Sequence, residues 1–196
     1  MGFRGDISGR VGLTAAIAAV AILAYAGPQG SPPSALDLVG RPVDPFSEES
    51  GASVLLFVRT DCPISNRYAP EVNRLHKKFA AQGVAFWLVY PDAGESAEAI
   101  RKHVSEFDLQ GVVLRDPYHV LVQASGVTIT PEAAVYKGHR RLLYRGRIDD
   151  RYVDFGRARP APTTHDLEQA LEAVLAGKPV RETRTRAVGC YISDLR

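Results

Sequence analysis

The chain has 196 residues, of which 45% are hydrophobic and 23% are charged, and its formal net charge is +2. These values are typical of a globular protein and leave room for one compact domain with an additional segment. The near balance of positive and negative residues gives no indication of a nucleic-acid-binding surface or of a strongly acidic partner.

Residues 1–26 have the layout of a secretory signal peptide. Arg4 and Arg10 precede or border the uncharged residues 11–26, which end in the small-residue pattern Ala24-Tyr25-Ala26. As a helix, these residues would measure roughly 24 Å, which is short of the roughly 30 Å hydrocarbon core of a bilayer. An uncleaved membrane anchor is the alternative, because the uncharged sequence continues to Leu36. In both cases we expect the domain to be exported, to the periplasm or another extracytoplasmic space.

After a linker over residues 27–34, rich in Pro, Gly and Ser, one domain is predicted over residues 35–178. It opens with a short strand and hairpin within residues 35–46. Apolar runs then indicate buried strands, and helical spacing of apolar residues indicates helices. The strands are expected over residues 54–58, 84–90 and 112–114, and the helices over residues 63–82, 95–107 and 118–124.

The end of the domain is predicted to be a hairpin and a helix. Strands over residues 132–136 and 141–148 are joined by a tight turn, which indicates an antiparallel pair. The last helix is expected to be capped by Thr163 or Thr164 and to stop at Gly177. Strands that alternate with helices and end in a hairpin predict a three-layer α/β/α sandwich with a mixed central sheet. Residues 179–196 are a tail that carries Cys190.

Cys62 is predicted to lie at a strand-to-helix junction. The apolar run 54–58 is followed by three polar residues and then by Cys62, and Pro63 suits the first turn of a helix. The N-terminal end of a helix favours a thiolate over a thiol, so this position suits a nucleophile. An inert, buried cysteine is the alternative. The polar neighbours Thr60, Asp61 and Ser65 favour the reactive thiol.

The helix after Cys62 is predicted to be amphipathic and kinked. Four apolar residues recur at helical spacing and should face the core: Tyr68, Val72, Leu75 and Phe79. Pro70 lies within this pattern and removes one backbone N–H, so we expect a kink there.

The element order, with Cys62 after the first central strand and Thr130-Pro131 before the hairpin, resembles the thioredoxin fold. The segments LLFVRTDCPISNRYAPEVNRLHKKF and LRDPYHVLVQASGVTITPEAAVY are similar to exported redoxins of the alkyl hydroperoxide reductase/thiol-specific antioxidant (AhpC/TSA) and thiol–disulfide interchange superfamily. The resemblance covers about residues 35–178. It implies that Cys62 is the attacking cysteine, that Pro131 is a cis-proline beside it that offers backbone to a substrate strand, and that Thr130 tunes the site.

The sequence departs from the motifs of three related groups. A thioredoxin-type C-x-x-C motif has Ser65 at its second position here, so the local resolving thiol is missing. A peroxiredoxin motif, P-x-x-x-T-x-x-C, has Leu55 and Arg59 at its Pro and Thr positions, so peroxidase activity is expected to be weak. A copper-delivering C-x-x-x-C motif has Asn66 at its second position. Ser65 remains a candidate hydrogen-bond donor to the Cys62 sulfur.

Cys190, 128 residues after Cys62, has three alternative roles. It resolves a mixed disulfide at Cys62, it forms a permanent structural disulfide with Cys62, or it joins Cys62 in binding a soft ion such as Cu(I). Its tail, Ala187-Val188-Gly189-Cys190, is a small apolar segment that is able to fold back over the Cys62 site. All three roles therefore depend on a short distance between the two cysteines.

Among the other polar residues, His76 and His103 are expected on solvated helix faces, and His119 is expected to be structural. The arginines of residues 140–159 alternate with aspartates and predict a salt-bridged surface rather than an anionic docking site.

The function predicted from the sequence is that of an exported thiol oxidoreductase. Cys62 is the nucleophile and Cys190 the candidate resolving thiol, while Pro131, Thr130 and Ser65 shape the site. No cofactor and no resident metal are expected. The expected partners are protein thiols or disulfides, or a small thiol or peroxide; no nucleic acid is expected, and membrane contact is expected only through an uncleaved N-terminal segment. The alternative is a non-enzymatic binding module or Cu(I) metallochaperone on the same fold.

Overall fold

The computed structural model describes residues 1–2, 34–46, 51–138 and 140–193. Apart from Met1, Gly2 and Ser34, the predicted signal peptide and linker lie outside the described residues, as does His139. Among the described helices, none has the length and apolar character needed to cross a bilayer.

Seven of the described strands form a mixed central sheet, in the order β2-β1-β5-β4-β3-β7-β8. The strands β3, β4 and β5 are parallel, whereas β7 pairs antiparallel with both β3 and β8. The predicted α/β class and mixed sheet are therefore confirmed. The strands are β1 (Ala35–Leu36), β2 (Pro42–Val43), β3 (Ala52–Phe57), β4 (Val84–Tyr90), β5 (Val112–Arg115), β7 (Glu132–Lys137) and β8 (Arg141–Gly146).

Alternation along β3 explains why the sheet has a core on each face. Val54 and Leu56 join one hydrophobic cluster, while Leu55 and Phe57 join the other, because successive strand side chains point to opposite faces. All six residues of β3 are buried. A continuous apolar run is therefore the appropriate sequence for this central strand.

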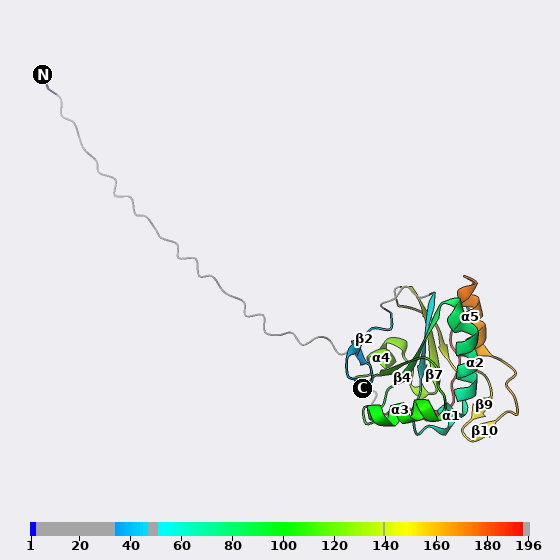
Figure 1. Cartoon of the computed structure of the whole chain (residues 1–196). Coiled ribbons are helices and arrows are strands. Elements are labelled where there is room, and N and C mark those ends of the chain that lie inside the picture. The colour runs from blue at the N-terminus through cyan, green and yellow to red at the C-terminus, as the bar shows by residue number, and fades with distance from the viewer. Residues whose placement is uncertain (3–33, 47–50, 139, 194–196) are drawn as a thin grey trace. The chain divides into compact units, whose positions relative to one another are not determined.

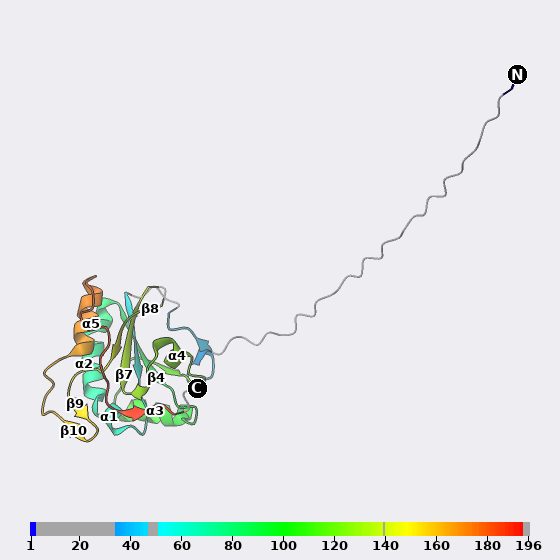
Figure 2. The ribbon, with the colours of Figure 1, turned by 180° about the vertical axis from the view of Figure 1, so that it is seen from behind.

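Helices cover both faces of the sheet and complete the three predicted layers (Figures 1 and 2). Helices α2 (Ala69–Phe79) and α5 (Asp166–Leu175) lie side by side on one face, and α3 (Ala97–Glu106) adds Ile100 to the same core. On the opposite face, α4 (Val120–Ser125) adds Leu121 and Val122 to the second core.

The helix after Cys62 is broken rather than kinked. Helix α1 (Pro63–Arg67) ends at Tyr68, and α2 begins at Ala69 with Pro70 in its first turn. Proline is tolerated there because the first N–H groups of a helix have no intrahelical acceptor. The predicted apolar stripe is confirmed, since its four members are all buried: Tyr68, Val72, Leu75 and Phe79.

The segment after β8 contains a small hairpin, β9 (Tyr152–Asp154) and β10 (Arg157–Ala158), and the predicted threonine cap of the last helix was wrong. Helix α5 is preceded by His165 without a side-chain cap, and the Thr163 hydroxyl and the Thr164 backbone N–H instead donate to Asp150. One first-turn donor of α5, the Leu167 N–H, instead donates to the Ile148 carbonyl oxygen, so the threonine side chains do not supply this cap.

The C-terminal tail packs against the domain. Thr183 and Thr185 exchange backbone hydrogen bonds with Arg145 of β8. Farther along, β11 (Cys190–Tyr191) pairs antiparallel with β6 (Ile129–Thr130), the short strand just before Pro131. The tail therefore brings Cys190 to the end of the sheet at which β3 delivers Cys62.

Candidate redox site

Cys62 occupies the position that its sequence predicts. It is the N-cap residue of α1, its backbone is extended, and Pro63 follows in the first turn. The side chain is fully buried, and Sγ donates to the Thr130 carbonyl oxygen at 3.2 Å. This thiol is therefore held between the start of α1 and the segment before Pro131.

The Thr130–Pro131 peptide bond is cis, as predicted from the resemblance. The structure thus brings Thr130 and Pro131 together with Cys62, although 68 residues separate Cys62 from Thr130. Thr130 is itself buried, and its hydroxyl contacts the Cys190 carbonyl oxygen at 3.4 Å.

Cys190 joins the same site through strand pairing. It lies directly opposite Thr130 in the β11–β6 pair, and both cysteines are free thiols. Gly189 makes this approach feasible, because a Cβ atom at that position would lie 2.1 Å from the Thr130 carbonyl oxygen. The sequence shows that Gly189 precedes Cys190, but only the fold shows that Gly189 packs against the backbone of Thr130.

The two thiols have opposite pKa shifts. Burial raises the pKa of Cys62, but hydrogen bonds from Cys190 and Ser65 outweigh it, so the pKa is lowered from its ordinary value. Burial and the neighbouring Cys62 raise the pKa of Cys190 to about 12. Ser65 is buried, and within the described residues its hydroxyl has no competing hydrogen-bond partner. The role predicted for Ser65 at the Cys62 sulfur stays a prediction.

Charged residues contact the loop that leads from β3 to Cys62. Arg59 forms ion pairs with Asp61 and Asp92, each at 3.0 Å, and thereby offsets both carboxylates. Glu95 accepts hydrogen bonds from the backbone N–H and the hydroxyl of Thr60, each at 2.7 Å. Burial nevertheless raises the pKa of the Glu95 carboxyl. These contacts fix the loop between β3 and Cys62.

His103 is not solvated, which corrects the sequence prediction. It is buried, and its ring nitrogens contact the Tyr90 hydroxyl and Asn66 Oδ1, each at 2.8 Å. Since Oδ1 accepts from Nε2–H, the Tyr90 hydroxyl donates to Nδ1, and the imidazole is neutral. Burial lowers the pKa of His103 accordingly. Asn66 in turn donates to the Thr60 carbonyl oxygen, so this network also supports the loop before Cys62.

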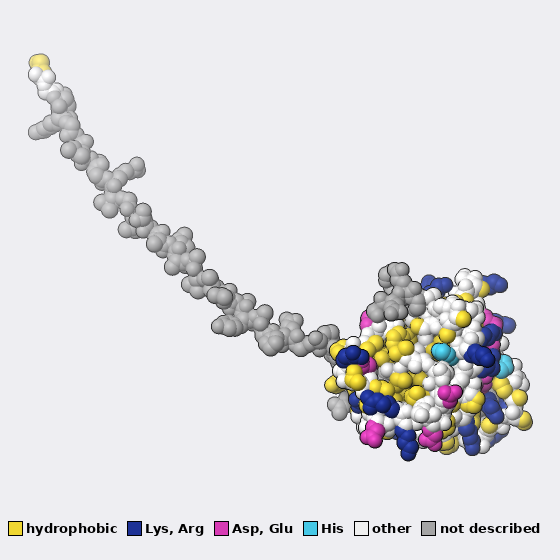
Figure 3. Space-filling model, in the orientation of Figure 1, with side chains coloured by type: hydrophobic (Ala, Val, Ile, Leu, Met, Phe, Trp, Pro, Cys, Tyr) yellow, Lys and Arg dark blue, Asp and Glu magenta, His cyan; other side chains and the backbone are white. Residues whose placement is uncertain are grey.

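The other predicted polar features are structural. Four of the arginines in residues 140–159 form ion pairs with Asp44, Glu132, Asp166 and Asp150; they are Arg140, Arg145, Arg147 and Arg159. On the face that Figure 3 shows, positive and negative side chains are interspersed rather than segregated. His119 donates from Nε2 to the Pro91 carbonyl oxygen and begins α4, in agreement with a structural role.

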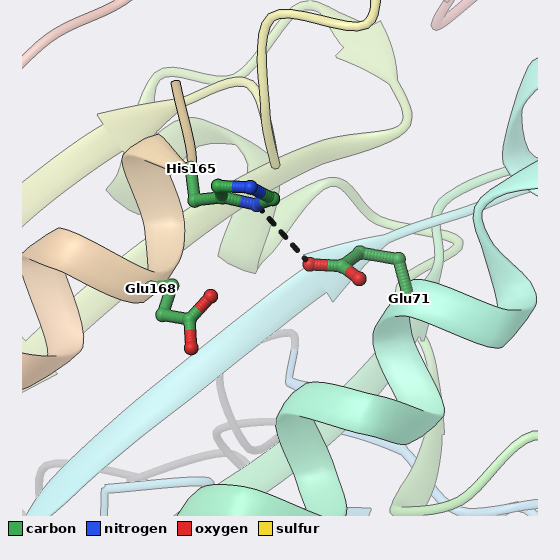
Figure 4. A group of neighbouring side chains, drawn as sticks. All are labelled: Glu71, His165 and Glu168. Atoms are coloured by element: carbon green, nitrogen blue, oxygen red, sulfur yellow. Dashed lines mark ion pairs between the residues drawn. The ribbon is translucent and has the colours of Figure 1, made fainter. Parts of the chain in front are cut away.

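Glu71, His165 and Glu168 gather between α2 and α5, with potential ligand atoms within 4.8 Å of one another (Figure 4). Their carboxylates are already neutralised by cationic side chains. Lys78 lies 2.6 Å from Glu168, and Arg74 pairs with both Glu71 and Glu168. This cluster fits an interhelical ion-pair network rather than a metal site.

The sequence profile of the AhpC/TSA family matches residues 35–148, which is more than half of the chain. The chain belongs to the AhpC/TSA family. This assignment agrees with the thioredoxin-like fold, with Cys62 after the first central strand and with the cis-proline segment beside it. The family and the fold together support a thiol oxidoreductase in general terms.

Similar solved structures agree with this fold. An uncharacterized conserved protein from Geobacillus kaustophilus is 25% identical, with 82% of this chain and 88% of that chain covered and a TM-score of 0.69. A hypothetical protein from Sinorhizobium meliloti is 27% identical, with coverage of 80% and 87% and a TM-score of 0.67. A putative thiol:disulfide interchange protein DsbE from Chlorobium tepidum is 22% identical, with coverage of 65% and 82% and a TM-score of 0.51. Among curated proteins, none matches the chain.

Proposed function

We propose that this AhpC/TSA-family chain is an extracytoplasmic thiol–disulfide oxidoreductase that uses Cys62 as its nucleophile and Cys190 as its resolving thiol. The observation that carries the proposal is that Cys190 lies opposite Thr130, whose carbonyl oxygen accepts from the Cys62 thiol, while the pKa of Cys62 is lowered and that of Cys190 is raised. An exported location is supported by the signal-like sequence of residues 1–26. The domain boundaries, residues 35–178 followed by the tail, are part of the same proposal.

The reaction is a pair of sulfur exchanges. The Cys62 thiolate attacks a substrate disulfide, forms a mixed disulfide and expels one substrate thiolate, which takes up a proton. Cys190 then loses its proton and attacks the Cys62 sulfur, which releases the second substrate thiolate. The substrate gains two electrons and the chain becomes a Cys62–Cys190 disulfide. An external dithiol returns the chain to its reduced state, and the reverse sequence oxidises a substrate dithiol.

The surrounding residues have separate roles in this proposal. Ser65 stabilises the Cys62 thiolate, whereas the Thr130 carbonyl oxygen accepts a hydrogen bond from the thiol form. Pro131 holds the Thr130 carbonyl beside the sulfur. The peroxidase alternative is less well supported, because Leu55 and Arg59 stand where a peroxiredoxin has its Pro and Thr, and Leu55 is fully buried in the second core.

Trapping of the mixed disulfide tests the proposal. The reduced Cys190→Ser protein, mixed with a small aromatic disulfide, should retain one substrate thiol on Cys62, as seen by intact mass and peptide mapping. The wild-type chain should release both thiols and become lighter by two hydrogens. Failure of Cys62 to form an adduct in the Cys190→Ser protein would refute the proposal. Equimolar Cu(I) binding that persists against a competing dithiol would favour the metallochaperone alternative instead.

A further inference from the structure

The tail strand β11 covers the sulfur that has to react. Cys62 has no exposed surface, although a sulfur exchange requires an incoming sulfur to reach it. The backbone beside this sulfur, that of Ile129 and Thr130, is already paired with Cys190 and Tyr191. Farther along, the Ile192 N–H donates to the Thr128 carbonyl oxygen at 3.0 Å. Residues 190–192 of the tail thus cover the backbone of residues 128–130 beside the Cys62 sulfur.

Gly189 is a fitted part of this cover. A Cβ atom there would lie 2.1 Å from the Thr130 carbonyl oxygen and 2.9 Å from Ile129 Cγ2. The backbone of Gly189 is not in the left-handed region, so the requirement for glycine comes from close approach rather than from backbone conformation. Any side chain at this position would push β11 away from β6.

The tail is held unevenly along its length. Its upstream part is anchored to β8: the Arg145 N–H donates to the Thr183 carbonyl oxygen, the Thr185 N–H donates to the Arg145 carbonyl oxygen, and the Thr185 hydroxyl contacts the Tyr144 hydroxyl at 2.7 Å. A Cβ atom at Gly146 would lie 2.1 Å from the Thr185 hydroxyl, so this anchor is closely packed.

The downstream part has fewer attachments. It consists of a two-residue strand and the buried Ile192 side chain, while Tyr191 is 77% exposed. Besides the hydrogen bond from the Ile192 N–H to Thr128, two side-chain contacts reach this part, from Arg59 Nη1 to the Tyr191 carbonyl oxygen and from the Thr130 hydroxyl to the Cys190 carbonyl oxygen, and each is long at 3.4 Å. Short strands with few buried contacts and few hydrogen bonds open locally at a fraction of the global unfolding free energy.

We propose that residues 187–192 are a removable cover, which opens about the anchor at Thr183–Thr185 and admits an external sulfur compound to Cys62. Closure returns Cys190 to its position opposite Thr130, where it contacts Cys62. The cover thus controls access and also delivers the resolving thiol. Its biological meaning rests on the proposed oxidoreductase function, but its opening is a property of the fold that is measured without turnover.

Adjacent residues of the tail offer a matched pair of variants. Ile192→Ala removes the buried anchor, whereas Tyr191→Ala changes an exposed side chain in the same strand. The reduced full chain is treated with iodoacetamide under native conditions, and modification of Cys62 is followed over time by peptide mass spectrometry. We expect Ile192→Ala to raise the rate at Cys62 by about tenfold or more, because opening becomes easier. The rate in Tyr191→Ala should match that of the wild-type chain.

Gly189→Ala provides a second, independent variant, since its added Cβ opposes the β11–β6 contact itself. It should accelerate Cys62 modification in the same direction as Ile192→Ala. Circular dichroism during denaturation separates local opening from global unfolding. The proposal is overturned if Cys62 of the folded wild-type chain reacts as fast as that of both opened variants, or if modification of the wild type requires global unfolding.

The outcome is independent of the oxidoreductase proposal. If alkylation follows the expected order but the Cys190→Ser protein forms no mixed disulfide, the cover is supported and the proposed function fails. If mixed disulfides form but the variants do not change the rate of Cys62 alkylation, the cover fails and the proposed function is retained.

Discussion

In the proposed reaction, the opposite pKa shifts of Cys62 and Cys190 set the sequence in which the two thiols react. While Cys62 is a thiolate, the Cys190 S–H donates to it, and a second negative charge beside the first is unfavourable. Once Cys62 has formed a mixed disulfide, that charge is gone. Cys190 then ionises more readily, at the step at which the proposed reaction needs a second nucleophile.

Removal of the Cys190 sulfur should make Cys62 less acidic. Cys190→Ala deletes a hydrogen-bond donor to the thiolate, so the pKa of Cys62 should rise toward or above its ordinary value. The titration of thiolate ultraviolet absorbance measures this pKa directly. Tyr191→Ala leaves the donor in place and should have no effect. A pKa for Cys62 that is unchanged in Cys190→Ala would contradict the assigned hydrogen bond.

The reciprocal substitution should make Cys190 more acidic. In Cys62→Ala, the neighbouring sulfur that opposes ionisation is absent, so the pKa of Cys190 should fall from about 12. The same absorbance titration, now of a chain with one thiol, gives the value. Burial also contributes to the raised pKa, so the fall should be partial. If the pKa does not move, burial alone accounts for it.

At the scale of single residues, local sequence was sufficient where the cause was local. An apolar run, a polar break and Pro63 placed Cys62 at the start of a helix. The burial of His103 was not predictable in this way, because its partners Tyr90 and Asn66 lie 13 and 37 residues away. Its position on a polar helix face reflects only its own helix, whereas its environment is set by β4 and α1.

At the scale of elements, the loop before Cys62 depends on Asn66. This side chain accepts from His103 and donates to the Thr60 carbonyl oxygen, so it connects α3, α1 and the end of β3. Asn66→Ala leaves these groups unpaired and should lower the free energy of unfolding by about 1–3 kcal/mol. Urea denaturation measures the change. Arg67→Ala, a change at an exposed neighbour, should cost much less, and an equal cost would show that the network is not responsible.

Helices α2 and α5 are joined by the ion pairs of Glu168 with Arg74 and Lys78. These pairs hold the pKa of Glu168 at about 2, below its ordinary 4.5. A lowered pKa means that the stabilisation is complete above the ordinary pKa and is lost as the pH falls from 4.5 toward 2. Arg74 and Lys78 are partly exposed, so solvent screening limits the contribution.

Glu168→Gln should therefore destabilise the chain by about 1 kcal/mol at neutral pH. The difference from the wild type should shrink as the pH falls below 4.5 and should vanish only below pH 2, where the wild-type carboxyl is protonated in the folded state as well. Denaturant titrations at several pH values test this, with Glu172→Gln as the control, because Glu172 pairs with Lys78 alone and is 53% exposed. A difference that persists in acid would show that packing, rather than charge, is the cause.

Features of a helix were predictable where neighbouring residues in the sequence determine them, as they do for the buried face of a helix or for a break caused by proline. The spacing of Tyr68, Val72, Leu75 and Phe79 identified the buried side of α2. The sequence predicted that Pro70 would disturb the helix, but not that a new helix would begin there. A kink and a new helix start differ only in how the preceding turn closes. The cap of α5 was missed because the Ile148 carbonyl oxygen, rather than a threonine hydroxyl, accepts from the Leu167 N–H, and this contact depends on the path of the chain after β8.

At the scale of the molecule, the tail joins both cores. Val188 and Cys190 pack against the cluster that contains Cys62, whereas Ile192 belongs to the cluster on the other face of the sheet. The sequence left three alternatives for Cys190, since its spacing of 128 residues from Cys62 is compatible with contact or with separation. The long-range pairing of β11 with β6 places Cys190 opposite Thr130 and therefore beside the Cys62 site.

Oxidation of the pair should stabilise the whole chain. A Cys62–Cys190 disulfide would close most of the domain into one loop and restrict the unfolded state, by about 5 kcal/mol in the chain-entropy model. The oxidised protein should therefore unfold at a higher denaturant concentration than the reduced protein. In Cys190→Ser, oxidising and reducing conditions should give the same unfolding curve.

The same free energy links stability to redox behaviour. Folding and reduction form a thermodynamic cycle, so a disulfide that stabilises the native chain is harder to reduce in the native state than in the unfolded state, by the same amount. Reduction by a fixed dithiol buffer should consequently proceed farther in denaturant than in its absence. Equal reduction in both states, together with unchanged stability on oxidation, would show that the cysteines do not form a disulfide in the folded chain and would leave Cys62 without its resolving partner.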